Sequence, residues 1–452
     1  MVKKKKEEST ESDKTTVDSD QTIPESSPSD LVPAEPKPAP AETKDEVEKP
    51  EKKAKKTKPS DDPFDAWMVQ AKGRWPGSIE TADNLPIDGT PTMSTGNFII
   101  DRMTYRGLRR GRLYRFWGRP KSAKTGSALN CAEAFTNNHC ATCFSHRLQC
   151  KCNSKEFRYA KVLYVDVEGR ISDNRPWIEA HGIHPSRIAM VSPKGGEQVV
   201  DMADAALRSE SGIGLVIIDS LAQMSSLSEV NKAAEKGMTI GRNALLINSA
   251  LRKWVCSIVS KDIAAPNKPT IIMINQIRNK TDSMGSPDVQ PGGLGQEFAS
   301  ACDVKFTKRQ RHYLVPNDKG GFEDKVVKYG DTGFAPDEDD TADFIEIEAK
   351  VTESGICPPG RFGTFNYWLR AGHGRRIGDV DNAVWVWEYA KKYELMKKLD
   401  KGGYRVDGID EAGHKVESIE GRTQKEVEAQ FMASPELQEV VWSRLIEILN
   451  KK

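Results

Sequence analysis

Eight residues with the sequence GRPKSAKT could bind the phosphates of a nucleotide. An apolar run precedes them and a helical pattern follows, so they would form a loop at a helix N-terminus, where backbone N–H groups attract anions. Lys124 would reach the β- and γ-phosphates, and the Thr125 hydroxyl would ligate Mg²⁺. An ordinary basic turn between a strand and a helix is the alternative. The candidate phosphate-binding residues are Gly118, Arg119, Pro120, Lys121, Ser122, Ala123, Lys124 and Thr125.

Ala123 stands where this loop pattern calls for glycine. If the backbone there needs a positive φ, alanine costs free energy because its Cβ crowds the following carbonyl oxygen. The sequence therefore predicts a phosphate loop whose nucleotide affinity is reduced at this residue.

Three polar residues follow apolar runs further along the chain. Glu168 follows KVLYVDV, Asp219 ends GLVIID, and Gln276 follows TIIMIN. Nucleotide hydrolysis needs a second Mg²⁺ contact, a base that orients water and a group that senses the γ-phosphate. We assign these roles to Asp219, Glu168 and Gln276 in that order. Each residue by itself could equally be a helix cap or a solubilising group at a strand end.

Four of the eight cysteines lie in one short window: Cys140 and Cys143, then six residues, then Cys150 and Cys152. Thiolates this close in sequence suit tetrahedral Zn²⁺, and a set of four thiolates is typical of a closed structural site. His139 or His146 could replace one of these cysteines, and free reduced thiols are the alternative. This cysteine usage fits a reducing compartment better than a disulfide framework.

The elements that would position these residues are apolar strands that alternate with amphipathic helices. Strands are predicted at 161–167, 188–192, 215–219, 270–275, 304–307 and 344–351, and helices at 127–137, 197–209, 239–259 and, by the spacing of apolar residues, within 423–449. This alternation favours an α/β fold with a mainly parallel central sheet flanked by helices. In such a sheet ligands bind at the carboxyl ends of the strands, where the phosphate loop, Glu168, Asp219 and Gln276 would all lie.

The composition limits the possible partners and the possible location of the chain. The net charge is +1, so binding to nucleic acid would depend on local basic loops. The chain has neither an apolar run long enough to span a bilayer nor an apolar signal-peptide segment at its N-terminus. Residues 1–62 carry few large apolar side chains and are predicted to be a disordered tail.

The order of these motifs resembles the RecA recombinase family, most of all its phage-encoded UvsX-like members. GRLYRFWGRPKSAKT is similar to the family's strand and Walker A loop, LYVDVEGR to the strand with its catalytic glutamate, and VIIDSLAQM to its Walker B strand. INQIRNK followed by PGGLGQEFASACDVKF is similar to its second DNA-binding loop. The resemblance covers the chain from about residue 93 onward.

The resemblance implies further site residues. ATP would bind at the phosphate loop, with Lys350 reaching the phosphates of a neighbouring subunit. Trp177 would lie against the adenine, and a core tryptophan is the alternative for this residue. A second lysine that is usual in this contact is Thr352 here, and Gly126 replaces a usual hydroxyl residue. The implied catalytic residues are Lys124, Glu168, Gln276 and Lys350, and the implied DNA-binding residues are Arg242, Arg278, Lys280, Gly292 and Gly293.

The composition, the cysteine spacing and the resemblance together predict a division of the chain. Residues 63–92 would be an N-terminal oligomerisation segment, 93–375 a RecA-like P-loop ATPase core, and 376–452 a small C-terminal α/β domain. Within the core, 138–157 would form a zinc-knuckle insertion, 225–242 the first DNA loop and 278–295 the second. The basic residues around the cysteines leave open whether the knuckle contacts DNA phosphate or is simply solvated.

The implied function is an ATP-dependent DNA recombinase that forms a filament on single-stranded DNA and catalyses homologous pairing and strand exchange. Two alternatives stay open: a RecA-like ATPase that acts as a motor or loader in replication, and a DNA-coating protein with weak or no hydrolysis. The expected cofactors are ATP, Mg²⁺ and structural Zn²⁺. The expected partners are single- and double-stranded DNA, further copies of the chain and ssDNA-binding or mediator proteins, in the cytoplasm (that of the host if a phage encodes the chain).

Overall fold

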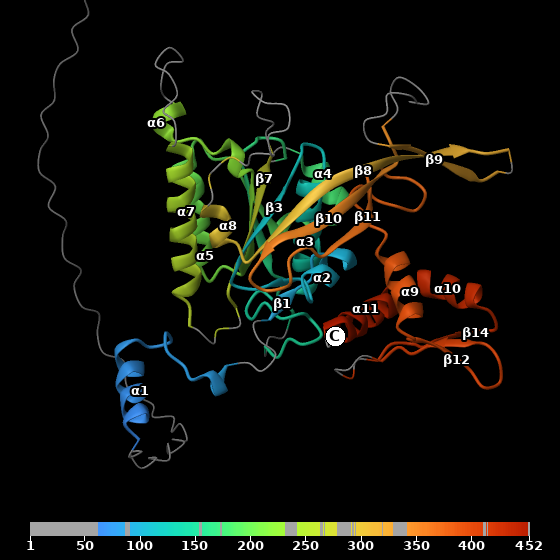
Figure 1. Cartoon of the computed structure of the whole chain (residues 1–452), viewed down its shortest axis with the longest axis horizontal. Helices are drawn as coiled ribbons and strands as arrows, with labels where there is room; N and C mark the ends of the chain where they lie inside the picture. Colours follow the sequence, from blue (N-terminus) through green and yellow to red (C-terminus); the bar gives the residue numbers. More distant parts are fainter. Residues whose placement is uncertain are drawn as a thin grey trace, which may run out of the picture. The chain divides into compact units, whose positions relative to one another are not determined.

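The structure is a computed structural model (Figure 1). It describes residues 62–85, 91–152, 156–171, 174–230, 242–262, 265, 267–277, 291, 293, 295–318, 320–328, 341–409, 413 and 415–450. The predicted disordered tail, 1–62, lies outside the described residues except for its last position.

A nine-stranded sheet forms the centre of the core, with the strand order β11-β10-β8-β3-β7-β6-β4-β5 and β9 paired to β8. The six strands from β8 to β5 are parallel, whereas β9, β10 and β11 are antiparallel to their neighbours. The predicted α/β fold with a mainly parallel sheet is therefore confirmed. The strands are β3 (Leu113–Gly118), β4 (Lys161–Asp166), β5 (Ile188–Val191), β6 (Ile213–Asp219), β7 (Thr270–Gln276), β8 (Cys302–Pro316), β9 (Phe322–Lys328), β10 (Phe344–Ser354) and β11 (Phe362–Trp368).

The strand β8 is much longer than the predicted 304–307. Its first residues, 302–306, are mostly buried and pair with β3, whereas residues 308–316 are largely polar and pair with β9 and β10. The apolar pattern predicts only the buried part of the strand, since the rest forms a ribbon with fewer buried side chains.

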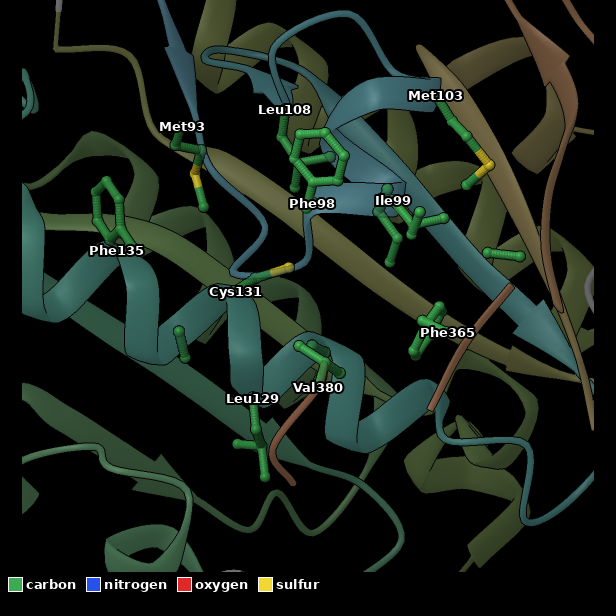
Figure 2. Packing of buried hydrophobic residues seen from close by; sticks show 14 of the residues in the cluster. Met93, Phe98, Ile99, Met103, Leu108, Leu129, Cys131, Phe135, Phe365 and Val380 are labelled. Atoms are coloured by element: carbon green, nitrogen blue, oxygen red, sulfur yellow. The ribbon is translucent and has the colours of Figure 1, made fainter. Parts of the chain in front are cut away.

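Helices cover both faces of the sheet. Successive side chains of a strand point to opposite faces, so a strand of consecutive apolar residues needs packing partners on both sides. Val216 and Ile218 belong to the apolar cluster with α5 (Gly196–Arg208) and α7 (Arg242–Val259). Ile217 belongs to the other cluster, with α2 (Phe98–Met103), α3 (Lys124–Asn138) and α4 (Arg175–Ala180). Figure 2 shows part of this second cluster, in which Phe98 and Ile99 of α2, Leu129 and Cys131 of α3 and Phe365 of β11 gather beside the sheet.

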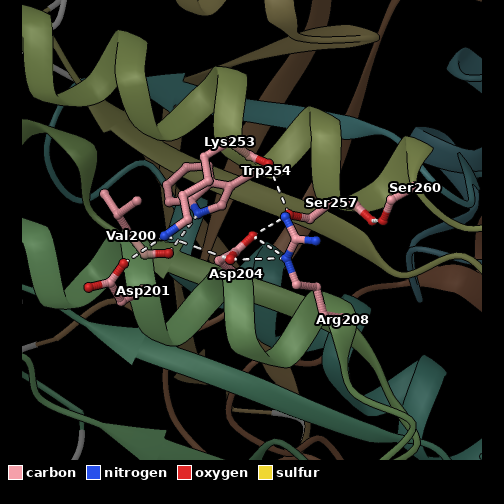
Figure 3. Close-up of polar contacts among 8 residues, drawn as sticks. All are labelled: Val200, Asp201, Asp204, Arg208, Lys253, Trp254, Ser257 and Ser260. Carbon is pink, nitrogen blue, oxygen red and sulfur yellow. Dashed lines mark hydrogen bonds and ion pairs between the residues drawn. The ribbon is translucent and has the colours of Figure 1, made fainter.

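The helices α5 and α7 are joined by polar contacts along their line of packing (Figure 3). The Trp254 indole N–H donates a hydrogen bond to the Val200 carbonyl, 3.2 Å away, and the Ser257 hydroxyl donates to Asp204. Asp204 also pairs with Arg208, and Lys253 pairs with Asp201 at 2.7 Å. Exposed ion pairs contribute little stability, so the buried indole and the apolar face mainly hold these helices together.

Several further elements, most of them short, lie before the C-terminal part. They are α1 (Pro63–Arg74), η1 (Ala82–Asn84), β1 (Thr92–Met93), β2 (Leu108–Arg109), η2 (Pro185–Arg187), η3 (Leu221–Gln223), α6 (Leu227–Val230) and α8 (Gly295–Ala299). None of the helices in the described part of the chain is both long and apolar enough to cross a bilayer.

The C-terminal part contains helices around a small antiparallel sheet. Its elements are α9 (Asn382–Lys392), β12 (Met396–Lys398), β13 (Tyr404–Val406), β14 (Ile419–Gly421), α10 (Gln424–Met432) and α11 (Pro435–Asn450). The helical spacing within 423–449 corresponds to two helices, because Pro435 cannot continue α10 and instead begins α11. The Asn382 amide donates to the Gly96 carbonyl at 2.8 Å and its oxygen accepts from the Phe98 N–H, which joins α9 to α2.

We predict that Asp101 makes unfolding depend on pH. This buried carboxyl accepts hydrogen bonds from Ser94 and Thr95, yet burial raises its pKa to about 6. The unfolded chain loses this proton near pH 3.8, so stability falls as pH rises from about 4 to 6, by a total of about 3 kcal/mol. Asp101→Asn should remove this component in urea unfolding measured across that range.

The exposed Asp83 supplies the control, because Asp83→Asn should leave the pH dependence of the wild type unchanged. If Asp101→Asn and the wild type lose stability equally between pH 4 and 6, the assignment to Asp101 is wrong.

Candidate functional site

The phosphate loop connects β3 to α3 and has two residues with a positive φ besides its glycine. Lys121 has φ 58° and Ala123 has φ 59°, ψ 20°. Ala123 is also the N-cap of α3 and has no side-chain acceptor, so no cap side chain satisfies the N–H groups of the first turn. These donors suit an anion. Ser122 and Lys124 are buried, whereas Arg119, Pro120 and Lys121 are exposed.

The positive φ that glycine would accept without strain is present at Ala123. The loop therefore adopts the left-handed conformation despite the alanine. Its side chains hold it together: the Ser122 hydroxyl and the Lys124 ammonium both donate to the Arg119 carbonyl, at 2.8 and 2.7 Å.

Tyr367 of β11 explains why glycine follows Thr125. A Cβ on Gly126 would lie 1.8 Å from the Tyr367 hydroxyl oxygen, so no other residue fits without moving this buried ring. The place of a second hydroxyl residue is thus taken by a hydroxyl from a distant strand.

Asp219 lies at the carboxyl end of β6, beside the start of α3. Its Oδ2 accepts hydrogen bonds from the Thr125 hydroxyl at 2.6 Å and from the Tyr164 hydroxyl at 2.7 Å. Burial raises the pKa of the Asp219 carboxyl, and the nearby Glu168 and Asp166 carboxylates raise it further. Burial also lowers the pKa of Lys124 to about 8, although Asp219 and Glu168 oppose this shift. These three carboxylates outnumber the two nearby cationic groups, Lys124 and Arg170, which favours a divalent cation. Carboxylate and hydroxyl oxygens are ligands that suit Mg²⁺.

Glu168 follows β4 and faces the ends of two other strands. Its Oε1 accepts hydrogen bonds from the Ser220 hydroxyl at 2.7 Å and from the Gln276 side-chain amide. Its Oε2 pairs with Arg170 at 3.0 Å, and only 5% of the side chain is exposed. The sheet thus brings Glu168, Asp219 and Gln276 to the edge where the phosphate loop begins.

The residues next to Gln276 hold the base of the segment 278–290. The Asn275 amide donates to the Pro291 carbonyl at 3.0 Å and to the Gln296 side-chain oxygen at 2.8 Å. The Gln296 amide also donates to the Pro291 carbonyl, at 2.7 Å, and both Asn275 and Gln296 are fully buried. The two ends of this segment are therefore tied together beside Gln276.

Several of the predicted DNA-binding residues, namely Arg278, Lys280 and Gly292, lie outside the described residues, as do 231–241 of the first loop. Gly293 is described, with φ +75°. Arg242, the first residue of α7, donates to the Ser228 hydroxyl at 2.8 Å, which joins the two sides of 231–241.

Lys350 and Trp177 lie apart from the cluster of strand ends. Lys350 is exposed on β10, which β8 separates from β3, and within the described part of the chain no hydrogen bond or ion pair joins it to the phosphate loop. The neighbouring Thr352 hydroxyl accepts a hydrogen bond from the Trp117 indole at 3.2 Å. Trp177 is half-buried on α4, with its ring centroid 4.4 Å from that of His181.

Sequence reasoning did not assign a role to Tyr164, Arg170, Ser220, Gln296 or Tyr367. Arg170 and Ser220 lie within two residues of Glu168 and Asp219, so proximity in the sequence could have identified them. Nothing local marks Tyr367, because it reaches α3 from a strand that comes more than 200 residues later.

The four cysteines of the insertion form a compact group. Their Sγ atoms all lie within 4.8 Å of one another, and those of Cys143 and Cys150 are 3.7 Å apart. A tetrahedral Zn²⁺ with Zn–S bonds of about 2.3 Å places its sulfurs about 3.8 Å apart, so the group fits zinc. The group contains neither of the histidines that the sequence left as possible ligands. His139 Nδ1 lies 2.8 Å from the Phe144 carbonyl, and His146 pairs with Glu439 of α11 at 3.0 Å.

Arg110 links the cysteine group to the core. It is 2% exposed, and it donates to the Cys143 carbonyl at 2.7 Å. Within the described part of the chain no carboxylate forms an ion pair with Arg110. A buried guanidinium needs nearby negative charge, which the thiolates of a metal-bound cysteine group would supply.

A family match and several similar curated proteins all point to one family. Residues 77–329, more than half of the chain, match the RecA N-terminal domain family. "Protein RecA" of Borreliella burgdorferi (strain ZS7) is 24% identical over 371 residues, which are 81% of this chain and 85% of that protein. "Protein RecA" of Borrelia turicatae is 25% identical over 76% of this chain and 78% of that protein. "Protein RecA" of Mesomycoplasma hyopneumoniae (strain 7448) is 29% identical over 50% of this chain and 58% of that protein.

We predict that Ala123→Gly stabilises the phosphate loop. Glycine removes the Cβ strain at φ 59°, so the free energy of unfolding should rise by about 1 kcal/mol. The matched control is Ala132→Gly within α3, where the backbone is helical and the same change should lower it by about 1 kcal/mol or more. A loss of stability in both variants, measured by urea unfolding, would contradict a strained Ala123.

We also predict that the purified protein contains one Zn²⁺ per chain. Elemental analysis after dialysis should find about one equivalent, and Cys143→Ser should reduce it to less than half. The control is Cys256→Ser, which changes an exposed cysteine on α7 away from the group and should leave the zinc content unchanged. Less than half an equivalent in the wild type would show that the group consists of free thiols.

Proposed function

Since the chain belongs to the RecA family, we propose that it is an ATP-dependent DNA recombinase that forms a filament on single-stranded DNA and pairs it with a homologous duplex. The observation that carries this proposal is the hydrogen bond from Gln276 to Glu168. It connects a residue placed for hydrolysis with the strand that leads directly into the proposed second DNA loop.

We assign ATP to the phosphate loop. The first-turn N–H groups of α3 and the ammonium of Lys124 would bind the phosphates, and Lys124 would leave the Arg119 carbonyl to do so. Thr125 and Asp219 would hold Mg²⁺, which neutralises phosphate charge when it is bound. Glu168, oriented by Ser220 and Arg170, would accept the proton of the attacking water.

Gln276 would make DNA binding depend on whether a γ-phosphate is present in the nucleotide site. A γ-phosphate would compete with Glu168 for the Gln276 amide. A shift of Gln276 would then be passed to its neighbour Asn275, whose amide holds Pro291 and Gln296 at the base of 278–290. The segment 278–295, with Arg278, Lys280, Gly292 and Gly293, would lie on single-stranded DNA, as would 225–242 with Arg242.

Filament assembly accounts for two features that a single chain does not use. Lys350 is exposed and away from its own phosphate loop, so we assign it to the nucleotide of a neighbouring subunit. The segment 63–92 carries Phe64 and Trp67 with about half of each side chain exposed, which suits a helix that docks on another copy.

Weak hydrolysis remains a specific alternative, because Ala123 holds a strained conformation in the loop itself. If the strain raises the free energy of the nucleotide-bound loop, the protein would coat DNA and turn ATP over slowly.

We also propose that zinc bound by Cys140, Cys143, Cys150 and Cys152 has a structural role.

The test is DNA-stimulated ATPase activity. Single-stranded DNA should stimulate the wild type, and Lys124→Ala should lose both nucleotide binding and hydrolysis. Glu168→Gln should still bind ATP while its hydrolysis falls about 100-fold or more, because the general base is lost. The matched controls are Lys161→Ala and Glu179→Gln, which change exposed residues of β4 and α4 and should keep wild-type activity.

Strand pairing separates the alternatives. The wild type should form joint molecules between a labelled oligonucleotide and a homologous supercoiled duplex only with ATP. Stimulated ATPase activity without joint molecules would favour a replication motor or loader. DNA coating without hydrolysis would favour the DNA-coating protein with slow ATP turnover.

A further inference from the structure

A continuous set of buried contacts connects Trp177 with the first turn of α3. The ring of His181 packs against that of Trp177, and His181 Nε2 lies 3.0 Å from the Tyr367 hydroxyl. The same hydroxyl lies against Gly126, two residues after Lys124. His181 and Tyr367 are 3% and 4% exposed, so this path is closed to solvent.

The hydrogen bonds of His181 have a fixed direction. Its Nδ1 lies 2.8 Å from the Trp177 carbonyl, which can only accept, so Nδ1 carries the hydrogen. Burial lowers the pKa of His181, which keeps the ring neutral. Nε2 is therefore an acceptor, and the Tyr367 hydroxyl donates to it.

Little space is left for either side chain to move. On one side a Cβ at Gly126 would be 1.8 Å from the Tyr367 hydroxyl oxygen. On the other side a Cβ at Gly378, which has φ +83°, would be 2.3 Å from His181 Cδ2. Two glycines thus allow the pair to sit directly between α4, α3 and the segment after β11.

We propose that Tyr367 and His181 are positioning residues that set the distance between the phosphate loop and Trp177, the side chain that the resemblance places against the adenine. They would thereby determine how strongly the site prefers a nucleoside triphosphate to a triphosphate that has no base. This inference rests on the proposed ATP site. Each residue would act through its neighbour, His181 through Trp177 and Tyr367 through Gly126, and not by contact with the nucleotide.

The test compares the dissociation constants of MgATP and magnesium tripolyphosphate by calorimetry. Tyr367→Phe keeps the ring against Gly126 but leaves His181 Nε2 without its donor. Affinity for MgATP should fall about tenfold because the base is no longer held in place, while affinity for tripolyphosphate stays within about twofold. The preference for the nucleotide should therefore fall by about the same factor of ten.

Tyr114→Phe is the matched control. Tyr114 is fully buried in β3 and its hydroxyl donates to the Arg109 carbonyl, so this variant loses a similar hydrogen bond elsewhere. Its preference for the nucleotide should equal that of the wild type. In a Trp177→Leu background, Tyr367→Phe should have no further effect on the preference, since the stacking side chain it positions is gone.

Three results would overturn the inference. They are an unchanged preference in Tyr367→Phe, an equal loss of affinity for both ligands, which a merely structural role would produce, and a further fall of the preference in the Trp177→Leu background. A wild-type protein that binds neither ligand would instead overturn the proposed nucleotide site itself.

Discussion

The hydrogen bond from Gln276 to Glu168 spans 108 residues of sequence and joins the ends of two strands, with Ser220 of the strand between them donating to the same carboxylate. Such a contact requires parallel strands whose carboxyl ends meet at one edge. The apolar faces of the sheet, covered by α5 and α7 on one side and α3 on the other, stabilise that arrangement. The packed sheet thus holds the polar groups at its carboxyl edge in place.

Buried charge is concentrated at junctions between parts of the fold. Arg115 of β3 pairs with Asp303 of β8, both almost fully buried, and Glu297 of α8 lies 3.6 Å from the same guanidinium. Arg115 thereby ties the strand before the phosphate loop to β8 and to α8, the two elements that follow the segment 278–290. Arg110, also buried, joins the core to the cysteine group through the Cys143 carbonyl. A buried charge that loses its partner costs much more than an exposed one, so these junctions are held in one arrangement.

The chain departs from the usual phosphate-loop pattern at Ala123 and at Gly126, and other side chains compensate for both departures. Ala123 keeps a left-handed backbone while the Ser122 and Lys124 side chains bind the loop carbonyl of Arg119. Gly126 makes room for the Tyr367 hydroxyl. The loop is therefore held by its own side chains, and the first turn of α3 that follows it is held by Tyr367 of β11.

The sequence by itself determined the α/β class, the mainly parallel sheet, the loop 118–125 between a strand and a helix, and the group of four cysteines, because each depends on local patterns of apolar residues or on residues close together in the chain. It also placed Glu168, Asp219 and Gln276 at strand ends, where parallel pairing brings them together. Only the tertiary structure decided which side chains support them. Tyr164, Gln296 and Tyr367 act through contacts with distant segments, and the long polar ribbon of β8 depends on pairing with β9 and β10. Contacts of this kind follow from packing between elements, which no local pattern encodes.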